Sequence, residues 1–199
     1  MSDTSVVLQE VELFFMQQGK VYEALQNITQ SLSKAGIDYA VIGGMALVIH
    51  GYIRTTQDVD LLLTPEGLDS FRSTLLGRGF MPAFAGATKM FKDVKTGVSI
   101  EIIATGEFPG DGKPKSVSFP NPAAVAVEKD GIKVVRLVTL IELKLSSGLS
   151  GRGRLKDLAD VQELIKVLSL PAELAQELDG SVQEEYSRLW LDVQPDVEN

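Results

Sequence analysis

The first 36 residues place apolar side chains at helical spacing in two runs, residues 5–16 and residues 20–35. Apolar residues that recur every three or four positions are typical of an amphipathic helix. Gly36 follows the second run, at a position where glycine commonly ends a helix. We therefore expect residues 1–36 to form N-terminal helices packed on the core.

Short apolar strands alternate with helices in the middle of the chain. The pattern predicts strands at residues 39–42 and 58–63, with a helix at residues 45–50 between them. Turn residues mark two hairpins and a loop or lid rich in glycine and proline. The further elements are a helix from Pro65 to Leu76, hairpins about residues 95–97 and 130–131, and the loop at residues 105–122.

Helices dominate the C-terminal part of the chain. Strands with helices before, between and after them indicate a single α/β (α+β) domain built on a small mixed sheet. The core sheet and active site would occupy residues 37–138, and residues 139–192 would form a C-terminal helical segment. The helices predicted there span residues 139–147, 155–168, 171–178 and 181–190, and a frayed tail is expected at 193–199.

The composition of the 199 residues, 44% apolar and 23% charged, is typical of a globular protein. The sequence has no cysteine, which excludes disulfides, thiolate catalysis and cysteine zinc sites. Its one histidine is too few for a histidine-rich metal site. The N-terminus is acidic where a signal peptide would be basic, and the longest apolar run, residues 39–53, is too short to span a bilayer. We expect a cytoplasmic protein with no membrane partner.

Two acidic residues, Asp58 and Asp60, stand at the start of the second predicted strand. Alternate side chains of a strand share a face, so the two carboxylates should lie roughly 6–7 Å apart on one side of the sheet. Carboxylates this close repel each other, and one would take up a proton unless a cation binds. Hard oxygen ligands favour Mg²⁺ or Mn²⁺ over zinc.

A third acid, Glu101, interrupts an otherwise apolar strand of the first predicted hairpin. Removing a charge from water is costly unless the charge is paired or bound to a metal. If this hairpin lies beside the strand at 58–63, Glu101 completes a catalytic and metal site with Asp58 and Asp60. The alternative is that Asp58 lies in a turn and Glu101 faces solvent on an edge strand.

Gly43 and Gly44 follow the first predicted strand and open a helix. Glycine lets the backbone approach a ligand closely, and free N–H groups at a helix start attract phosphate. Close packing between the strand and the helix would explain the pair equally well. A phosphate-binding site next to a carboxylate metal site is typical of a phosphoryl or nucleotidyl transferase.

The segment VIGGMALVIHGYIRTTQDVDLLL resembles the Gly-Gly, then Asp-x-Asp signature of the DNA polymerase β-like nucleotidyltransferase superfamily. Its closer likeness is to a minimal bacterial branch that includes the AbiEii-type toxin nucleotidyltransferases. The resemblance covers residues 37–168 and implies the nucleotidyltransferase fold, with Glu101 as the third metal-binding acid where many relatives carry Asp. The matching motifs are HG at 50–51, RTTQDVD at 54–60, LIELKL at 140–145 and KDLAD at 156–160.

Other residues are candidates for nucleotide binding. Arg54 and Thr56 precede the carboxylates and could orient them or touch phosphate. Lys144 leaves an apolar helix face, so its stem could lie along that face with its amine in water, or, as the resemblance implies, its amine could contact the triphosphate. Asp157 matches the Lys-Asp pair of the family. His50 is expected to cap or pack at the end of its helix rather than to catalyse.

A basic segment at residues 144–156 contrasts with the net charge of −8. Its glycine-rich turn could mould around a phosphate or form a solvated turn. The overall negative charge disfavours duplex DNA as a partner, whereas a tRNA end could use this local patch. The four cations of the segment are Lys144, Arg152, Arg154 and Lys156.

These features predict a Mg²⁺- or Mn²⁺-dependent nucleotidyltransferase that moves a nucleoside monophosphate from an NTP to a hydroxyl and releases pyrophosphate. The resemblance implies that the acceptor is a tRNA end, a protein or a small molecule such as an aminoglycoside. It also implies a toxin–antitoxin role with a cognate antitoxin as partner. The alternative is a catalytically silent nucleotide-binding or protein-interaction module that retains the fold.

Overall fold

The computed structural model describes residues 19–151 and 153–194 of the chain. The helix expected at residues 5–16, Arg152 and the last five residues of the tail lie outside the described residues. Within the described residues, no helix combines the length and the apolar character that crossing a membrane requires.

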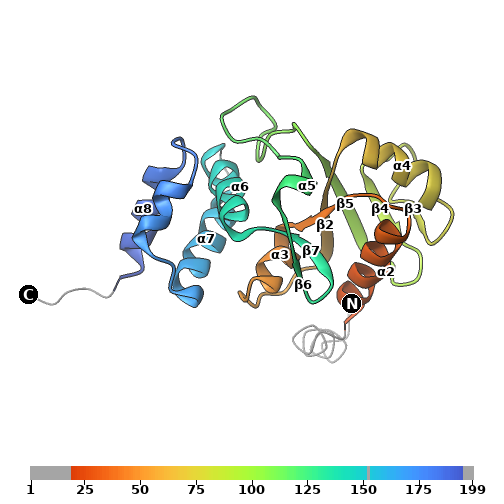
Figure 1. Ribbon diagram of the computed structural model, residues 1–199, viewed down its shortest axis with the longest axis horizontal. Helices are drawn as coiled ribbons and strands as arrows, with labels where there is room; N and C mark the ends of the chain where they lie inside the picture. The colour runs from red at the N-terminus through yellow and green to blue at the C-terminus, as the bar shows by residue number, and fades with distance from the viewer. Residues whose placement is uncertain (1–18, 152, 195–199) are drawn as a thin grey trace, which may run out of the picture.

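A seven-stranded mixed sheet forms the centre of the molecule (Figure 1). Parallel pairing joins β1 to β7 and β2 to β5, and the other neighbours are antiparallel. The fold predicted from the sequence, a mixed sheet flanked by helices, is therefore confirmed. The strand order is β3 (Phe80–Pro82), β4 (Met90–Asp93), β5 (Ser99–Ala104), β2 (Asp58–Leu63), β1 (Ala40–Ile42), β7 (Ile132–Val135) and β6 (Ala126–Lys129).

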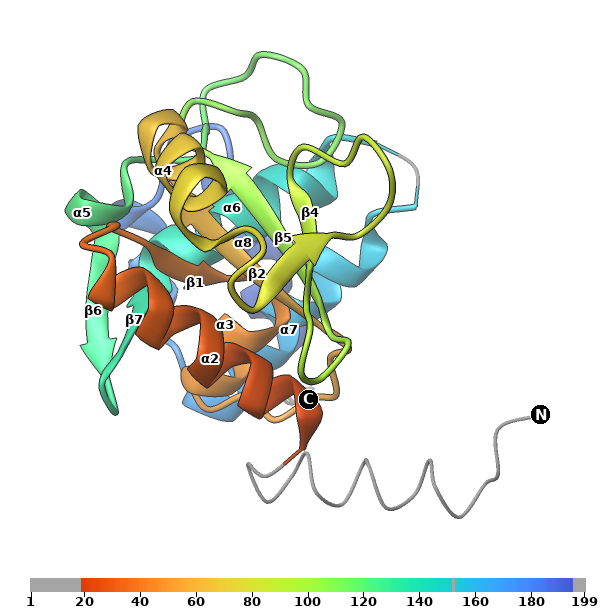
Figure 2. The same ribbon diagram turned by 90° about the vertical axis from the view of Figure 1, so that its right-hand side faces the viewer.

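Helices cover both faces of the sheet. The helices α2 (Lys20–Lys34) and α4 (Pro65–Leu75) pack on one face, and α3 (Gly43–Ile49) packs on the other (Figure 2). The helices α6 (Leu137–Leu149) and α7 (Leu155–Leu168) pack on each other and lie beyond α3. This arrangement leaves the α6–α7 pair beside the end of the sheet that carries the acidic residues.

Both predicted hairpins are confirmed. The strands β4 and β5 are antiparallel neighbours, as are β6 and β7. The second turn uses Asp130 and Gly131 with φ values of 49° and 77°, the positive values that a tight two-residue hairpin turn requires. The boundaries of α7 agree with the prediction of a helix at residues 155–168.

The structure differs from the predicted elements at three places. The helix expected at residues 171–178 is a 3₁₀ helix, η1 (Ala172–Glu177), none of whose residues is fully buried. The short strand β3 and the one-turn helix α5 (Pro122–Val125) were not predicted, because elements of three or four residues show no measurable periodicity. The last helix is α8 (Gln183–Asp192).

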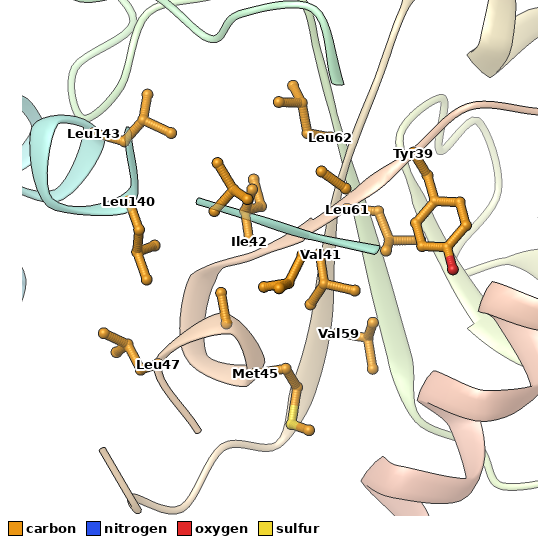
Figure 3. Close-up of a cluster of buried hydrophobic side chains, with 14 of the residues drawn as sticks. Tyr39, Val41, Ile42, Met45, Leu47, Val59, Leu61, Leu62, Leu140 and Leu143 are labelled. Carbon is orange, nitrogen blue, oxygen red and sulfur yellow. The ribbon is translucent and has the colours of Figure 1, made fainter. Parts of the chain in front are cut away.

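The core anchors the strand that carries the acids. Side chains of β1, β2, α3 and α6 meet in one cluster (Figure 3), in which Val41, Met45, Leu61 and Leu140 are at most 1% exposed. The second half of β2 is fully buried in this cluster, whereas its first residue, Asp58, is exposed. Since packed interiors resist displacement, β2 presents its acids from a rigid support.

Candidate active site

The two strands that carry the predicted acids are neighbours in the sheet. The strand β5 pairs with β2 in parallel, and Glu101 stands directly opposite Asp60 in the register. Residues opposite each other in a parallel pair point to the same face, and Asp58 lies two positions before Asp60 on that face. The expectation that the hairpin containing Glu101 lies beside the Asp58–Asp60 strand is confirmed.

A pocket of about 320 Å³ opens beside these acids. It lies between the sheet, the helix α6 with the start of α7, and the loop that follows β5. Charged and apolar side chains share its walls. From the predicted site it is lined by Gly43, Asp60, Glu101, Lys144, Arg154 and Asp157.

Asp60 is the most electrostatically perturbed acid of this group. Burial, together with the negative charges of Asp58 and Glu101, raises the pKa of Asp60 to about 7. The charge of Lys144 and a hydrogen bond donated by the N–H of Gly44 oppose this rise. The three carboxylates are therefore close enough to repel, and the group needs a proton or a cation to relieve that repulsion.

The first glycine of the pair is required by the position of Asp60. Gly43 has a φ of +62°, and a Cβ at this residue would lie 2.7 Å from Asp60 Cγ and closer still to Oδ2. A side chain here would be strained by the backbone and would also displace the Asp60 carboxylate. The close-packing explanation of this glycine is thus confirmed, and it places the backbone of Gly43 against the carboxylate at the pocket wall.

The second glycine makes room for Thr56. A Cβ at Gly44 would lie 2.6 Å from Thr56 Oγ1. The Thr56 hydroxyl in turn donates a 2.8 Å hydrogen bond to Asp58 Oδ1, so Thr56 orients this carboxylate.

The carboxylates of Asp58, Asp60 and Glu101 are the type of ligand that a hard divalent cation prefers, but their oxygens do not meet at one point in this conformation. Among residues 19–151 and 153–194, no three side chains of His, Cys, Asp or Glu are arranged closely enough to hold a metal ion as they stand. Asp58 and Glu101 are exposed, so rotamer changes could bring their oxygens toward Asp60 at little cost. Carboxylate oxygens are the ligands of Mg²⁺, and the repulsion at Asp60 is the interaction that such an ion would relieve.

Lys144 does not extend into water. Its side chain is 13% exposed, and its Nζ donates to Asp157 Oδ1 at 2.7 Å and to Asp160 Oδ2 at 2.8 Å. Burial alone would lower the pKa of Lys144, but the charges and hydrogen bonds of these two acids raise it above its ordinary value. The idea that Lys144 covers an apolar face with its amine in solvent is therefore wrong. The amine is a fixed positive charge at the pocket wall.

Asp157 and Arg54 belong to the same network. Ser147 donates a 2.6 Å hydrogen bond to Asp157 Oδ2. Arg54 Nη1 reaches both oxygens of the buried Asp160, at 2.6 and 2.7 Å. Arg54 thus ties the segment before β2 to α7, and the contact of Arg54 with phosphate stays a prediction.

The other predicted cations are placed differently. Arg154 lines the pocket and donates a 3.0 Å hydrogen bond to the carbonyl of Gly110. Lys156 is exposed on the first turn of α7 and is not brought to the pocket. Arg152 lies outside the described residues.

His50 has the structural role expected of it. It ends α3 and is buried, with Nε2 at 2.7 Å from the carbonyl of Val135, and Nδ1 accepts from Lys129 Nζ at 3.2 Å. Burial first, and then the charge of Lys129, lowers the pKa of His50, despite the hydrogen bond to Val135. A neutral packing histidine is the result.

Several pocket residues were not identified from the sequence. Ser147 could have been found, because it follows Lys144 by one helical turn on α6. Phe108 and Phe119 lie in the 105–122 segment, where no periodic pattern indicates which side chains face a ligand. Glu107 also lines the pocket and forms an ion pair with Lys89.

Two solved structures of ANT(2'')-Ia, with TM-scores above 0.5, support the architecture, and JHP933 is reported beside them. The antibiotic-resistance factor ANT(2'')-Ia, determined in solution, aligns with a TM-score of 0.53 and 13% identity over 85% of this chain and 95% of that protein. A crystal structure of ANT(2'')-Ia with adenylyl-2''-tobramycin aligns with a TM-score of 0.52 and 10% identity over 86% and 96% of the two chains. JHP933 from Helicobacter pylori has a TM-score of 0.48 and 15% identity, over 86% and 89%. At these identities the likeness concerns the fold.

Comparison with curated proteins finds no match. A family model described as uncharacterised nucleotidyltransferase matches residues 7–171, which is most of the chain and includes every residue of the candidate site. The fold, the acids of β2 and β5 and the glycine pair agree with that assignment. The chain belongs to this nucleotidyltransferase family.

Proposed function

We propose that this protein is a Mg²⁺-dependent nucleotidyltransferase that moves a nucleoside monophosphate from an NTP to a hydroxyl acceptor. The observation that carries the proposal is the placement of Asp58, Asp60 and Glu101 on one face of two paired strands, with Asp60 and Glu101 at the wall of a pocket. Three carboxylates that repel one another have a use when they bind the cation that accompanies a triphosphate. Mn²⁺ would serve in the same site.

The residues around the acids have distinct parts in this reaction. Lys144 and Arg154 supply positive charge that would stabilise the phosphates, and the backbone at Gly43 closes the wall beside Asp60. Thr56 holds the Asp58 carboxylate in place. When bound, the metal ion would neutralise phosphate charge and lower the pKa of the attacking hydroxyl. The acceptor oxygen forms a new bond to the α-phosphorus as its proton passes to water, while the bond from the α-phosphorus to the bridging oxygen breaks and pyrophosphate leaves.

The proposal names the acceptor by its chemical class only. One fold neighbour, ANT(2'')-Ia, is seen with adenylyl-2''-tobramycin, a nucleotidylated small molecule, so a small-molecule hydroxyl is one acceptor type that this fold serves. A tRNA end and a protein hydroxyl are the other two. On the resemblance of the sequence motifs to AbiEii-type toxins alone, we further propose a cytoplasmic toxin controlled by an antitoxin.

The test is transfer of label from each α-³²P nucleoside triphosphate, with Mg²⁺, to components of a cell extract, to purified tRNA and to an aminoglycoside mixture. We expect the wild-type chain to label one acceptor class and to release pyrophosphate. Asp60→Asn should reduce the rate at least about a hundredfold, because it removes one charge from the metal-binding group. Glu128→Gln is the matched control, since Glu128 is exposed on β6 at the far edge of the sheet.

A silent nucleotide-binding module is the second candidate, and one observation favours it: no three acids of the described residues are arranged as a formed metal site. Calorimetric titration with Mg·NTP separates the two functions. Binding accompanied by labelling supports the transferase. Binding without labelling of any acceptor, in the presence of Mg²⁺ or Mn²⁺, contradicts it and supports the module.

A further inference from the structure

The loop that follows β5 forms part of the pocket wall. Residues 106–120, called the roof loop below, leave the end of β5 and run toward α6 (Figure 1). The loop closes at its base, where the N–H of Gly106 donates to the carbonyl of Phe119 and the N–H of Phe119 donates to the carbonyl of Glu107, both at 2.8 Å. Phe108, Pro109, Gly110 and Phe119 of the loop line the pocket.

The far part of the roof loop is fixed to the end of α6. Gly110 has a φ of +78°, and a Cβ there would lie 2.8 Å from Ser150 Cβ and 2.9 Å from the carbonyl of Ser147. The N–H of Asp111 donates to Ser150 Oγ at 3.2 Å, and Arg154 donates to the carbonyl of Gly110. The roof loop is thus attached at both ends, and Phe108 lies between the two attachments.

Phe108 differs from Phe119, the other phenylalanine of the loop. Both phenylalanines are half-buried and line the pocket, but Phe119 also packs against the hydrophobic core, and Phe108 is not part of that packing. Among the described residues, ring-to-ring contacts involve Phe71, Phe80 and Phe91, and Phe108 makes none. An aromatic side chain at a pocket wall, with no ring partner among the described residues, is suited to stacking on a planar ligand.

The other lining residues of the pocket indicate which kind of planar ligand fits. Ile103, Leu140 and Leu143 extend the apolar wall, and the acids and Lys144 share the same space of about 320 Å³. A ligand that fills it must combine a flat apolar ring with a group that attracts cations. A nucleoside triphosphate combines both.

We propose that Phe108 stacks on the base of the bound nucleoside triphosphate and is a main determinant of its affinity. This inference rests on the proposed function and adds the base-binding residue to it. Stacking on an aromatic side chain tolerates every base, because each base has a π-face. The roof loop positions the ring, and the charged residues hold the phosphates independently of it.

The experiment compares two ligands, one with a base and one without. Dissociation constants are measured by calorimetry for the four Mg·NTPs and for Mg·tripolyphosphate, and the NTP bound most tightly is analysed. Phe108→Ala should weaken that NTP about 5- to 100-fold and leave tripolyphosphate within about twofold. Phe108→Trp should restore NTP affinity, since it keeps an aromatic face. Phe84→Ala is the matched control, because Phe84 is 59% exposed and does not line the pocket.

Two results would overturn the inference while leaving the proposed function intact. One is an unchanged NTP affinity in Phe108→Ala, and the other is an equal loss for NTP and tripolyphosphate, which would mean that the variant disturbs the loop as a whole. If the wild-type chain binds none of the four Mg·NTPs, the proposed function fails and this inference fails with it. If circular dichroism shows that Phe108→Ala is misfolded, Phe108→Leu is used in its place. The same selective loss of NTP affinity is expected for Phe108→Leu, and an unchanged NTP affinity in this variant would contradict the inference.

Discussion

Gly43 shows how one missing side chain can make room for a candidate site residue, Asp60. The carboxylate of Asp60 occupies the space that a Cβ on Gly43 would fill. Gly36 is a useful comparison, since its φ of +67° is similar and a Cβ there would meet nothing within 4 Å. The two glycines therefore separate the cost of backbone strain from the cost of displacing the carboxylate.

We predict that Gly36→Ala lowers the free energy of unfolding by about 1 kcal/mol through backbone strain alone. Gly43→Ala should cost about 1–3 kcal/mol more, because overlap with Asp60 is added to the same strain. Urea denaturation measures both values. Equal destabilisation by the two substitutions would show that Asp60 moves aside without cost.

Asp60 should make the stability of the protein depend on pH. Its pKa is raised from 3.8 to about 7 on folding, so between these pH values the folded state binds a proton that the unfolded state has released. The free energy of unfolding therefore falls as pH rises through this window. The stability is present below the unfolded pKa and is lost once the pH passes the folded pKa.

The comparison of wild type with Asp60→Asn isolates this effect, because other titrating groups contribute to both proteins. Without divalent cations, we expect Asp60→Asn to gain about 2–3 kcal/mol relative to wild type between pH 5 and pH 8. Urea denaturation at a series of pH values measures the difference. A difference that does not vary with pH would mean that Asp60 is ionised throughout.

The contact between the segment before β2 and the helices α6 and α7 depends on one buried acid. Asp160 of α7 accepts from Arg54 and from Lys144 of α6, and its side chain is 4% exposed. Removing one partner of a buried ion pair leaves the others without compensation. One buried group of charged side chains therefore holds the segment before β2, α6 and α7 together.

Asp160→Asn should lower the free energy of unfolding by about 3 kcal/mol. Asp69→Asn provides the control, because Asp69 pairs with Arg72 on the surface of α4, where its side chain is 76% exposed. That variant should change stability by less than about 0.5 kcal/mol. Thermal and urea unfolding of both variants test the prediction, which fails if the two losses are alike.

Some features of the whole molecule can be predicted from the periodicity of the sequence, and others are determined only by tertiary contacts. The mixed sheet, both hairpins and the helix at residues 155–168 follow from apolar spacing and turn residues, which are local properties. The spacing of Asp58 and Asp60 and the isolated charge of Glu101 are also local properties of the sequence, so the three acids could be identified as candidates. Their shared face depended on β5 pairing with β2, a contact between segments about 40 residues apart that local patterns do not specify.

The remaining parts of the site arise from long-range contacts. The sequence placed Lys144 on an apolar helix face, but its pairing with Asp157 and Asp160 depends on how α7 packs on α6. Phe108 lies in a loop without periodicity, and its position depends on the attachment of Gly110 to Ser150. Spacing along the chain cannot identify residues that are brought together by such attachments.

The most direct test of the metal-bound acidic group is a crystal structure of the chain grown with Mn²⁺ and a non-hydrolysable NTP analogue, with anomalous scattering used to locate the ion. The account predicts an anomalous peak about 2.0–2.2 Å from carboxylate oxygens of Asp58, Asp60 and Glu101, with the phosphates on the same ion. A fully occupied nucleotide whose Mn²⁺ has no contact with Glu101, or an ion bound elsewhere in the chain, would contradict it.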